Sequence, residues 1–446
     1  MAAAAWTDCV RVPTLFDDCT TTSIVSDQFG SATRKSQLTT AGNRPCIQMT
    51  GLDGTLQVRW TKAAAISLQA DAECIYVLMR CSDPYLLEQG TATQVYWFPE
   101  TSAGSDTVDT TNTLNGGLWS VEEVGDGWTL VCVPFSLMTV AGSATVTDQR
   151  TKRTMRIAVR VTVASGTKPD VYIGGIWIGG AQRTKLVLAY DGCYISQKTL
   201  AKVAHDLYDI PGTLYVPWSV VDQSASYLST SDLDVFYAAG WDICPHSFSG
   251  VALSTLTYQQ MVDEIGNAQR AQLGRGYTRG VDHLAWAYNV GSSNADATIR
   301  ANVYAALRAS GVKTVRVGGA GSGLTHLRPL SQGLSLGTIE DLPKTIYSPQ
   351  LTSGLSIAQA RASVETMIRH RLPGHVYCHE IAANQGATVS GSASNYITPT
   401  NYDQTTTPGA TQSWMPWLNT MRAQGSIDLV TISDWYTSLT QPALVV

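Results

Sequence analysis

The chain has 446 residues, of which 44% are hydrophobic and 15% are charged, and its formal net charge is −5. These values indicate a globular protein of two or three domains, and without a basic run the chain is not expected to bind nucleic acid. No stretch reaches the roughly 20 apolar residues of a membrane span, and residues 1–6 lack the basic start and apolar segment of a signal peptide.

The nine cysteines are scattered along the chain, and no two of them form a CxxC pair. An odd number of cysteines argues against a complete disulfide framework. We therefore expect some of them to be buried as small apolar side chains.

Residues 1–25 show few periodic signals and are expected to form an amino-terminal arm or adaptor. From 26 to 182 the sequence predicts strands, because runs rich in β-branched and aromatic residues are separated by segments rich in Gly, Asp, Ser and Thr. Many strands without a helical period predict a jelly-roll-like β-sandwich. The predicted strand runs are Ile75–Arg80, Thr93–Phe98, Trp128–Val133, Met155–Val163 and Val171–Ile178.

Aromatic residues in this half have two interpretations. An aromatic face suits the apolar C–H face of a pyranose ring, so these side chains could stack on sugars as in carbohydrate-binding sandwiches. Alternatively, they fill the core of the sandwich. The residues concerned are Trp60, Tyr96, Trp97, Trp119 and Trp128.

From 183 to 446 strands are followed by helices, which predicts a parallel sheet or barrel. In the first strand four apolar residues, Leu186 to Ala189, lead to Asp191 and Gly192. Asp191 is therefore expected at the carboxyl end of a parallel strand, where α/β barrels place their chemistry. The alternative is that Asp191 only caps the turn that follows.

Capping patterns predict helices in the same half. Thr257 with Gln260 forms a capping-box pattern before one helix, and Gly311 is placed to end another. The later segments of this half also alternate between strand and helix. Strands are expected at Gly212–Val216, Trp241–Cys244, Leu284–Tyr288, Thr314–Val317, His375–His379 and Leu429–Ile432, with helices at Ser356–Ile368 and Trp414–Met421.

Residues 185–439 resemble the polysaccharide deacetylase family (carbohydrate esterase family four), whose fold is a distorted (β/α) barrel. Ala189–Tyr194 stands where the family has Thr-Phe-Asp-Asp-Gly-Tyr, and Gly240–Gly250 matches its strand followed by His-Thr-x-x-His. Trp286–Asn289 aligns with a Tyr-Pro-Tyr-Gly segment, His379 with a late histidine, and Gly425–Tyr436 with the closing strand and helix. The order and spacing of these five segments make the resemblance specific.

The resemblance also implies roles for individual residues. In the family the first Asp of the opening motif is the catalytic base, the second Asp and two histidines bind a divalent metal, and the late histidine is the general acid. Asp191 would then be the base, His379 the acid and His246 the one surviving metal ligand. Gly192 and Gly250 occupy the other ligand positions, so the metal site is degenerate.

The register at the opening motif leaves an alternative. A one-residue slip would make Asp191 the metal carboxylate and put Tyr190 at the base position. We prefer the ungapped register because Tyr194 and Ser196 then also match. Gly250 leaves a ligand missing in either register.

Two routes could preserve chemistry at such a site. Cys193, Cys244 and Cys378 lie beside the motif segments and could rebuild a zinc site of non-standard composition, unless they are packed as small side chains. Alternatively, Asp191 and His379 could act without a metal by general base catalysis. The cofactor is thus expected to be absent or to be a divalent metal.

The resemblance leaves candidates for substrate binding and excludes other histidines. Trp286, Tyr288 and Tyr194 are the residues expected to contact a glycan. The remaining histidines that we considered are expected to be structural because they lie on helices, in a loop or before a strand: His205, His283, His326 and His370.

We expect a protein that binds, and in one hypothesis deacetylates, cell-surface polysaccharide outside the cell that made it. The rival hypothesis is an inactive barrel that serves as a glycan-binding or structural module. A missing leader and an adaptor-like arm fit a phage tail fibre or tailspike on the virion surface that meets capsule or lipopolysaccharide. Such proteins are often homotrimers that contact other virion proteins, although no heptad stretch here predicts a coiled coil.

Overall fold

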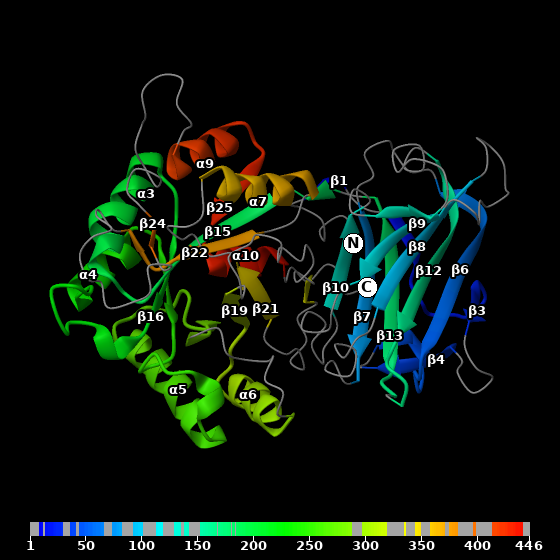
Figure 1. Ribbon diagram of the computed structural model, residues 1–446, viewed down its shortest axis with the longest axis horizontal. Helices are drawn as coiled ribbons and strands as arrows, with labels where there is room; N and C mark the ends of the chain where they lie inside the picture. Colours follow the sequence, from blue (N-terminus) through cyan, green and yellow to red (C-terminus); the bar gives the residue numbers. More distant parts are fainter. Residues whose placement is uncertain are drawn as a thin grey trace.

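The computed structural model describes residues 9–11, 14–29, 36–41, 44–66, 74–82, 92–100, 113–118, 129–134, 138–141, 152–166, 168–179, 181–182, 184–287, 297–318, 334–335, 344–348, 357–370, 374–381, 396–397 and 413–439. Figure 1 shows antiparallel strands at one end of the longest axis and a mixture of strands and helices at the other. The chain therefore combines β and α/β organisation. In the part of the chain just defined, no helix is long and apolar enough to cross a membrane.

Two antiparallel sheets account for the amino-terminal half. One has the strand order β20-β10-β7-β13-β5-β4, with β2 also paired to β13, and the other has the order β11-β9-β8-β12-β6-β3. The five strand runs predicted in this half coincide with β7, β8, β10, β12 and β13, apart from Trp128, which lies outside the described residues, and Val163, which follows β12. The bounds are β2 Thr14–Asp17, β3 Val25–Phe29, β4 Ser36–Ala41, β5 Arg44–Met49, β6 Thr55–Ile66, β7 Cys74–Cys81, β8 Ala92–Pro99, β9 Thr113–Leu118, β10 Thr129–Pro134, β11 Thr139–Ala141, β12 Thr154–Thr162, β13 Val171–Ile178 and β20 Leu334–Ser335.

A single hydrophobic cluster joins these two sheets. Val159 of β12 belongs to it together with Val77 of β7, which lies in the other sheet. Trp60 and Trp97 are fully buried in the same cluster, so they fill a core and cannot stack on a ligand. Tyr96 lies on the opposite face of β8, while Trp119 and Trp128 are outside the described residues.

Part of residues 1–25, expected to form an arm, is built into this half. β2 pairs with β13, and Phe16 and Cys19 are buried in the core. β1 (Cys9–Arg11) pairs with β14 (Ala181–Gln182). The expectation of a separate arm is wrong for these residues, because a four-residue strand with one inward apolar side chain is too short to give a periodic signal.

The carboxyl-terminal half is organised around β15 (Thr184–Asp191). β15 is parallel to β16 (Thr213–Val216), β22 (Gly374–Cys378) and β25 (Ile427–Val430), and β16 also pairs with β17 (Asp242–Pro245). Nearly all residues of β15 are buried, as expected for a parallel strand that is covered on both faces. A second parallel sheet has the order β18-β19-β21, and β17 lies next to β18 as β21 does next to β22. Its strands are β18 His283–Ala285, β19 Thr314–Gly318 and β21 Lys344–Ser348.

Helices of this half start where the sequence carries capping residues. The capping box of Thr257 and Gln260 is confirmed at the start of α5, and Ser229 with Asp232 forms another before α4. These caps satisfy backbone N–H groups that a helix start otherwise leaves without a partner. The helices are α3 Val203–Tyr208, α4 Thr230–Ala238, α5 Tyr258–Gly274, α6 Ala297–Ala309, α7 Ile357–His370, α9 Trp414–Ala423 and α10 Ile432–Leu439.

Two predicted strands extend by two or more residues beyond the ends of the observed ones. The last strand was expected to include Ile432 but ends at Val430, because the Thr431 hydroxyl accepts a hydrogen bond from the backbone N–H of Asp434 and caps α10. The strand expected to reach Tyr288 ends at Ala285, and Tyr288 itself lies outside the described residues.

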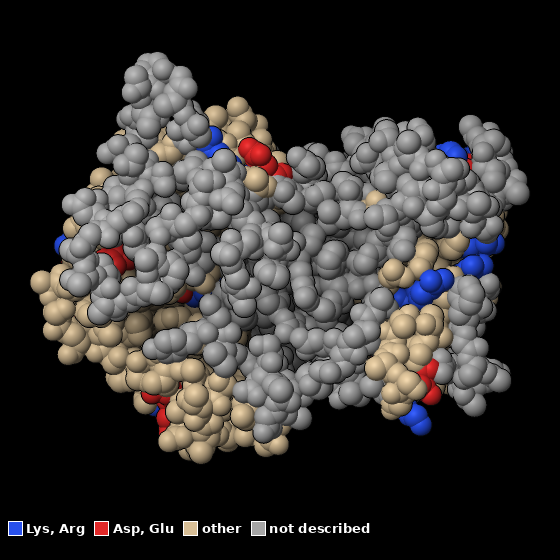
Figure 2. Space-filling model, in the orientation of Figure 1, with Lys and Arg blue, Asp and Glu red and all other residues tan. Residues whose placement is uncertain are grey.

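A continuous apolar cluster connects the two halves. Tyr76 and Leu78 of β7 belong to it together with Val187 of β15 and with Ile432 and Trp435 of α10. β20, which lies between the parallel strands β19 and β21 in the sequence, also pairs with β10 of an antiparallel sheet. Figure 2 shows basic side chains on the outer flank of the half that holds the antiparallel sheets.

Candidate functional site

Asp191 is the last residue of β15 and is only 1% exposed. Its Oδ2 atom accepts a hydrogen bond from the Nη2 atom of Arg316, and the two groups form a buried ion pair. Its Oδ1 atom is buried without a hydrogen-bond partner. Asp191 therefore does more than cap the next turn, since its carboxylate points into the molecule at the end of a parallel strand.

Arg316 is the residue of this site that the sequence reasoning missed. It lies on β19, is 0% exposed, and its guanidinium carbon is 4.0 Å from the centre of the Tyr377 ring and 5.3 Å from that of Tyr215. Aromatic faces attract a cation, and this attraction is stronger away from water. The carboxylate and the two rings thus stabilise a buried positive charge, although two guanidinium nitrogens, Nε and Nη1, have no hydrogen-bond partner.

His379 follows β22 and lies beside the same carboxylate. Its Nε2 atom is 3.9 Å from the Asp191 Oδ2 atom, and 24% of its side chain is exposed. The Nε2 atom of buried Gln197 donates hydrogen bonds to the backbone oxygens of both Asp191 and His379, each at 2.7 Å. Gln197 therefore holds the ends of β15 and β22 together.

His246 follows β17 and is almost fully buried. Its Nδ1 atom donates to the backbone oxygen of Ala285 at 3.0 Å, which leaves Nε2 as the unprotonated nitrogen of the ring. The imidazole interacts electrostatically with Asp191, Arg316 and His379. The structure thus brings together, at one end of the parallel strands, the residues predicted to be the acid (His379), the base (Asp191) and the metal ligand (His246).

The charges at this site are fixed by burial and by Arg316. Burial alone would raise the pKa of Asp191, but Arg316 and the two imidazoles lower it below its ordinary value. Burial lowers the pKa of His246 to about 4 and also lowers that of His379. At neutral pH the site therefore contains one carboxylate, one guanidinium and two neutral imidazoles.

The residues present do not fit the divalent metal that the resemblance implies. Among the described residues, no three His, Cys, Asp or Glu side chains are grouped so that they could hold an ion. His246 offers one imidazole, and the Asp191 carboxylate is already paired with Arg316. Gly192 and Gly250 have no ligand side chain, and a Cβ atom at Gly192 would lie 2.5 Å from the Tyr194 ring. Zinc sites in proteins need three or four fixed ligands, which this arrangement does not supply.

The three cysteines near the motifs do not rebuild a metal site either. Cys193 and Cys378 pack in the apolar cluster that includes the helices, whereas Cys244 packs in the cluster that joins the two halves. Burial raises the pKa of all three thiols, that of Cys193 to about 12. A metal binds thiolates, so neutral thiols in separate clusters favour the packing interpretation.

The predicted glycan contacts are only partly available. Trp286 is 2% exposed and packs with residues of α5 and α6, so it is corrected to a core residue. Leu284, two residues earlier, belongs to the same apolar cluster. Tyr194 is half-buried, next to Gly192, with its ring centre 5.6 Å from that of Tyr227.

Two further histidines, His205 and His283, serve the fold. The Nε2 atom of His205 forms a hydrogen bond with the Tyr190 hydroxyl at 2.7 Å, and the Nδ1 atom of His283 lies 2.9 Å from the Thr314 hydroxyl. Both are buried. The side chains of His326 and His370 lie outside the described part.

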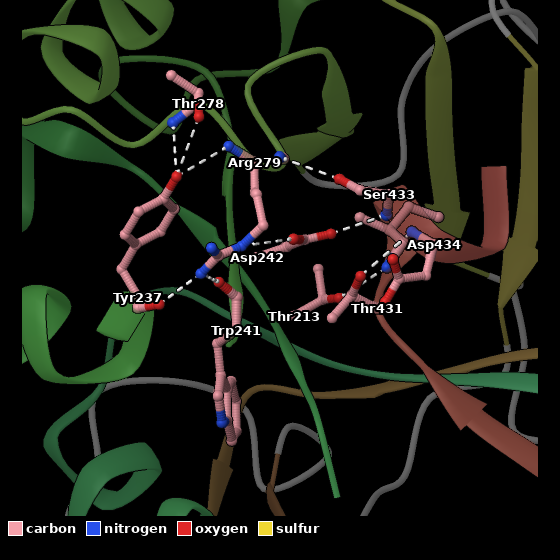
Figure 3. A network of polar contacts seen from close by, with 11 residues as sticks. Thr213, Tyr237, Trp241, Asp242, Thr278, Arg279, Thr431, Ser433 and Asp434 are labelled. Atoms are coloured by element: carbon pink, nitrogen blue, oxygen red, sulfur yellow. Dashed lines mark hydrogen bonds and ion pairs between the residues drawn. The ribbon is translucent and has the colours of Figure 1, made fainter. Parts of the chain in front are cut away.

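A second charged group lies at the other end of β17. Asp242 begins this strand, and its carboxylate accepts a hydrogen bond from the Ser433 N–H at 2.7 Å and lies 3.8 Å from the Nε atom of Arg279 (Figure 3). The Arg279 guanidinium in turn lies 3.9 Å from the centre of the Tyr237 ring. These contacts join α4, β17 and α10, so we assign this group to the fold.

Similarity to known proteins is found among solved structures. No protein-family model matches the sequence, and no curated protein does. Among solved structures, similar ones include a family 4 carbohydrate esterase from Streptomyces lividans in complex with acetate, at 16% identity, over 56% of this chain and 94% of the esterase, with a TM-score of 0.34. A family 4 acetyl xylan esterase from Clostridium thermocellum in complex with a cobalt ion has 12% identity over 48% of this chain and 88% of its own, with a TM-score of 0.27. A family 11 carbohydrate-binding module from Clostridium thermocellum in complex with a mixed-linked tetrasaccharide has 9% identity over 37% of this chain and 95% of the module, with a TM-score of 0.27.

Proposed function

We propose that the protein binds acylated polysaccharide and that its carboxyl-terminal half is a distorted deacetylase-like barrel without a catalytic metal. In this proposal the amino-terminal sheets form a jelly-roll-like sandwich, residues 26–182, and the barrel extends from 183 to the end. In this proposal Asp191, His246 and His379 meet at one polar end of the barrel, and the glycan binds there against His379, the partly exposed residue of the three.

The observation that carries this proposal is the buried ion pair of Asp191 with Arg316. A carboxylate held by a guanidinium is a weak base, because protonating it would leave the guanidinium buried without its counter-charge. Its lowered pKa agrees with this view. In this proposal Asp191 therefore does not act as the catalytic base, and His246 does not hold a metal. Both residues serve binding only.

The ligand class follows from the motif resemblance and from the position of the site. Asp191, His246 and His379 come from three separate motif segments and meet where parallel strands end. That end carries the functional loops in α/β barrels. The partly exposed, neutral imidazole of His379 can hydrogen-bond the hydroxyl and acyl oxygens of a sugar.

A second candidate function is slow acyl-ester hydrolysis without a metal, and the position of His379 favours it. This imidazole is partly exposed, neutral at neutral pH and 3.9 Å from the Asp191 carboxylate. It could take a proton from water while the water oxygen attacks the acyl carbon. The proton would then pass to the departing sugar oxygen, which leaves acetate and a free hydroxyl. The Asp191 carboxylate would stabilise the imidazolium formed between these steps.

One experiment separates the candidates. Acetylated xylan oligosaccharides are incubated with the wild type and with His379→Gln, and acetate release, binding by calorimetry and zinc content are measured. The control is Arg270→Gln on an exposed position of α5. The proposal predicts binding that His379→Gln weakens, without acetate release and without stoichiometric zinc. Acetate release that His379→Gln abolishes would establish the hydrolase, and zinc-dependent release by a one-to-one zinc complex would overturn both.

The setting that we propose is the surface of a phage particle, with capsule or lipopolysaccharide as the glycan. It predicts that the purified protein competes with phage adsorption to capsulated cells, and that it sediments as a trimer. A monomer that does not bind capsulated or lipopolysaccharide-bearing cells would contradict it.

A further inference from the structure

A five-residue loop, 246–250, follows directly on the carboxyl end of β17. The backbone N–H of Ser219 donates to the backbone oxygen of Phe248 at 2.9 Å, so this loop lies beside the one that follows β16. β16 is paired in turn with β15 up to Asp191. Loop 246–250 therefore stands at the same end of the parallel strands as the Asp191 carboxylate.

Two residues of loop 246–250 have left-handed backbone conformations. Ser247 has φ 55° and Gly250 has φ 74°. A serine in this region is uncommon, and such a conformation persists only where the surrounding structure holds it. The backbone N–H of Gly250 donates to the Ser247 hydroxyl at 2.9 Å, which closes the turn. The shape of this loop thus depends on its contacts more than on the local preferences of its residues.

Further contacts come from Glu264 of α5, the helix that packs against β17. Its Oε2 atom accepts hydrogen bonds from the backbone N–H groups of Phe248 and Ser249, at 3.0 Å and 2.8 Å, and from the Ser249 hydroxyl at 2.9 Å. Hydrogen bonds to a charged acceptor are stronger than those between neutral groups, and consecutive N–H groups form a natural site for an anion. One oxygen of a half-buried carboxylate therefore ties the tip of the loop to the helix.

Phe248 gives the tip of the loop an apolar surface. This residue is half-buried, and Ser249 next to it is exposed. Within the described part of the chain, Phe248 belongs to none of the apolar clusters that form the core. Its backbone N–H is bound by Glu264 and its backbone oxygen by Ser219, so its main chain is held on both sides. A partly exposed ring on a fixed main chain suits contact with the apolar C–H face of a sugar.

We infer that loop 246–250 forms one rim of the glycan site, that Phe248 stacks there on a pyranose ring, and that Glu264 is the residue that positions this rim. The inference rests on the proposed function, because it takes the end of the strands around His379 as the place where the glycan binds. It assigns to the site an apolar contact that the carboxylate and the imidazoles do not provide. Without Glu264 the loop would have to be ordered when the glycan binds, and this cost would reduce the affinity.

The test measures binding of acetylated xylan oligosaccharides by calorimetry. The variants are Phe248→Ala, Glu264→Ala and Glu264→Gln, of which the last keeps an oxygen that can accept from the same N–H groups. Asp263→Ala removes a carboxylate from the neighbouring, exposed position of α5 and serves as the control. Thermal unfolding checks that each variant is folded, and hydrogen exchange of the Phe248 and Ser249 amides reports on the loop itself.

We expect about tenfold weaker binding for Phe248→Ala and for Glu264→Ala, and we expect Glu264→Gln to recover most of the affinity. In Glu264→Ala the two amides should exchange at least about tenfold faster, because they lose their acceptor. The control should match the wild type in both measurements. Unchanged affinity in folded Phe248→Ala or Glu264→Ala would overturn this inference alone, as would unchanged amide exchange in Glu264→Ala. A wild type that binds no oligosaccharide would refute the proposed function, and this inference with it.

Discussion

Replacing Arg316 by methionine tests the central feature of the site. The change keeps a long side chain between Tyr215 and Tyr377 but leaves the Asp191 carboxylate buried without its counter-charge. Breaking a buried ion pair from one side typically costs about 3–5 kcal/mol of unfolding free energy. The Oδ1 atom of Asp191 already lacks a partner, so we expect a loss in this range.

The effect of pH distinguishes a lost charge from lost packing. In the wild type the pKa of Asp191 is lowered, so its stabilisation is present above the unfolded value, near 3.8, and is lost as pH falls through the lower folded value. Without Arg316, burial dominates and raises the pKa of Asp191 above that of the unfolded chain. Protonation of Asp191 then removes the unpaired buried charge from the variant. The difference in unfolding free energy between variant and wild type should therefore narrow as the pH falls from 8 toward 5.

Urea unfolding followed by tryptophan fluorescence at both pH values measures this gap. The double variant Asp191→Asn and Arg316→Met should recover most of the loss, because neither charge is then left alone. Arg270→Met, on an exposed position of α5, should change stability by less than about 0.5 kcal/mol. A loss below about 1 kcal/mol for Arg316→Met, equal at both pH values, would refute the argument.

Three further predictions concern single positions. Gly192→Asp, which restores the family residue, should destabilise the protein by about 1–3 kcal/mol in thermal unfolding, because the position has φ +87° and faces the Tyr194 ring. The variant should not bind an equivalent of zinc, and a zinc-dependent rise in Tm would contradict this. Thr257→Ala should cost about 1 kcal/mol of unfolding free energy by removing the cap of α5, with Thr255→Ala, two residues earlier and exposed, as the comparison. Cys193 should resist a thiol reagent at pH 8 until urea unfolds the chain, since burial raises its pKa to about 12, and fast labelling of the native protein would exclude the buried position.

Strand runs and helix caps were predictable because they depend on local chemistry. The β-branched run of β12 and the Thr257–Gln260 pair each act within a few residues, and both have the predicted consequence in the structure. The meeting of Asp191 and His379 followed from motif order, since the ends of parallel strands in one sheet lie together. Their chemical roles stay proposals.

Arg316 could not be recognised from its own segment. In the run Thr314–Val317 an arginine between two valines is typical of a half-exposed strand, where alternate residues face water. A strand inside a parallel α/β half is covered on both faces, so an arginine there requires a buried carboxylate. The partner, Asp191, lies 125 residues earlier, and only the fold brings the two together. Trp286 was misjudged for the same reason, because a motif position does not tell which face of a strand is covered.

The apolar cluster that includes Trp435 of α10 couples the antiparallel sheets to the parallel strands. Leu78 of β7 and Val187 of β15 lie in this same cluster, so neither half can lose its packing without exposing apolar surface of the other. The two halves are therefore expected to unfold together, in one cooperative transition rather than in two.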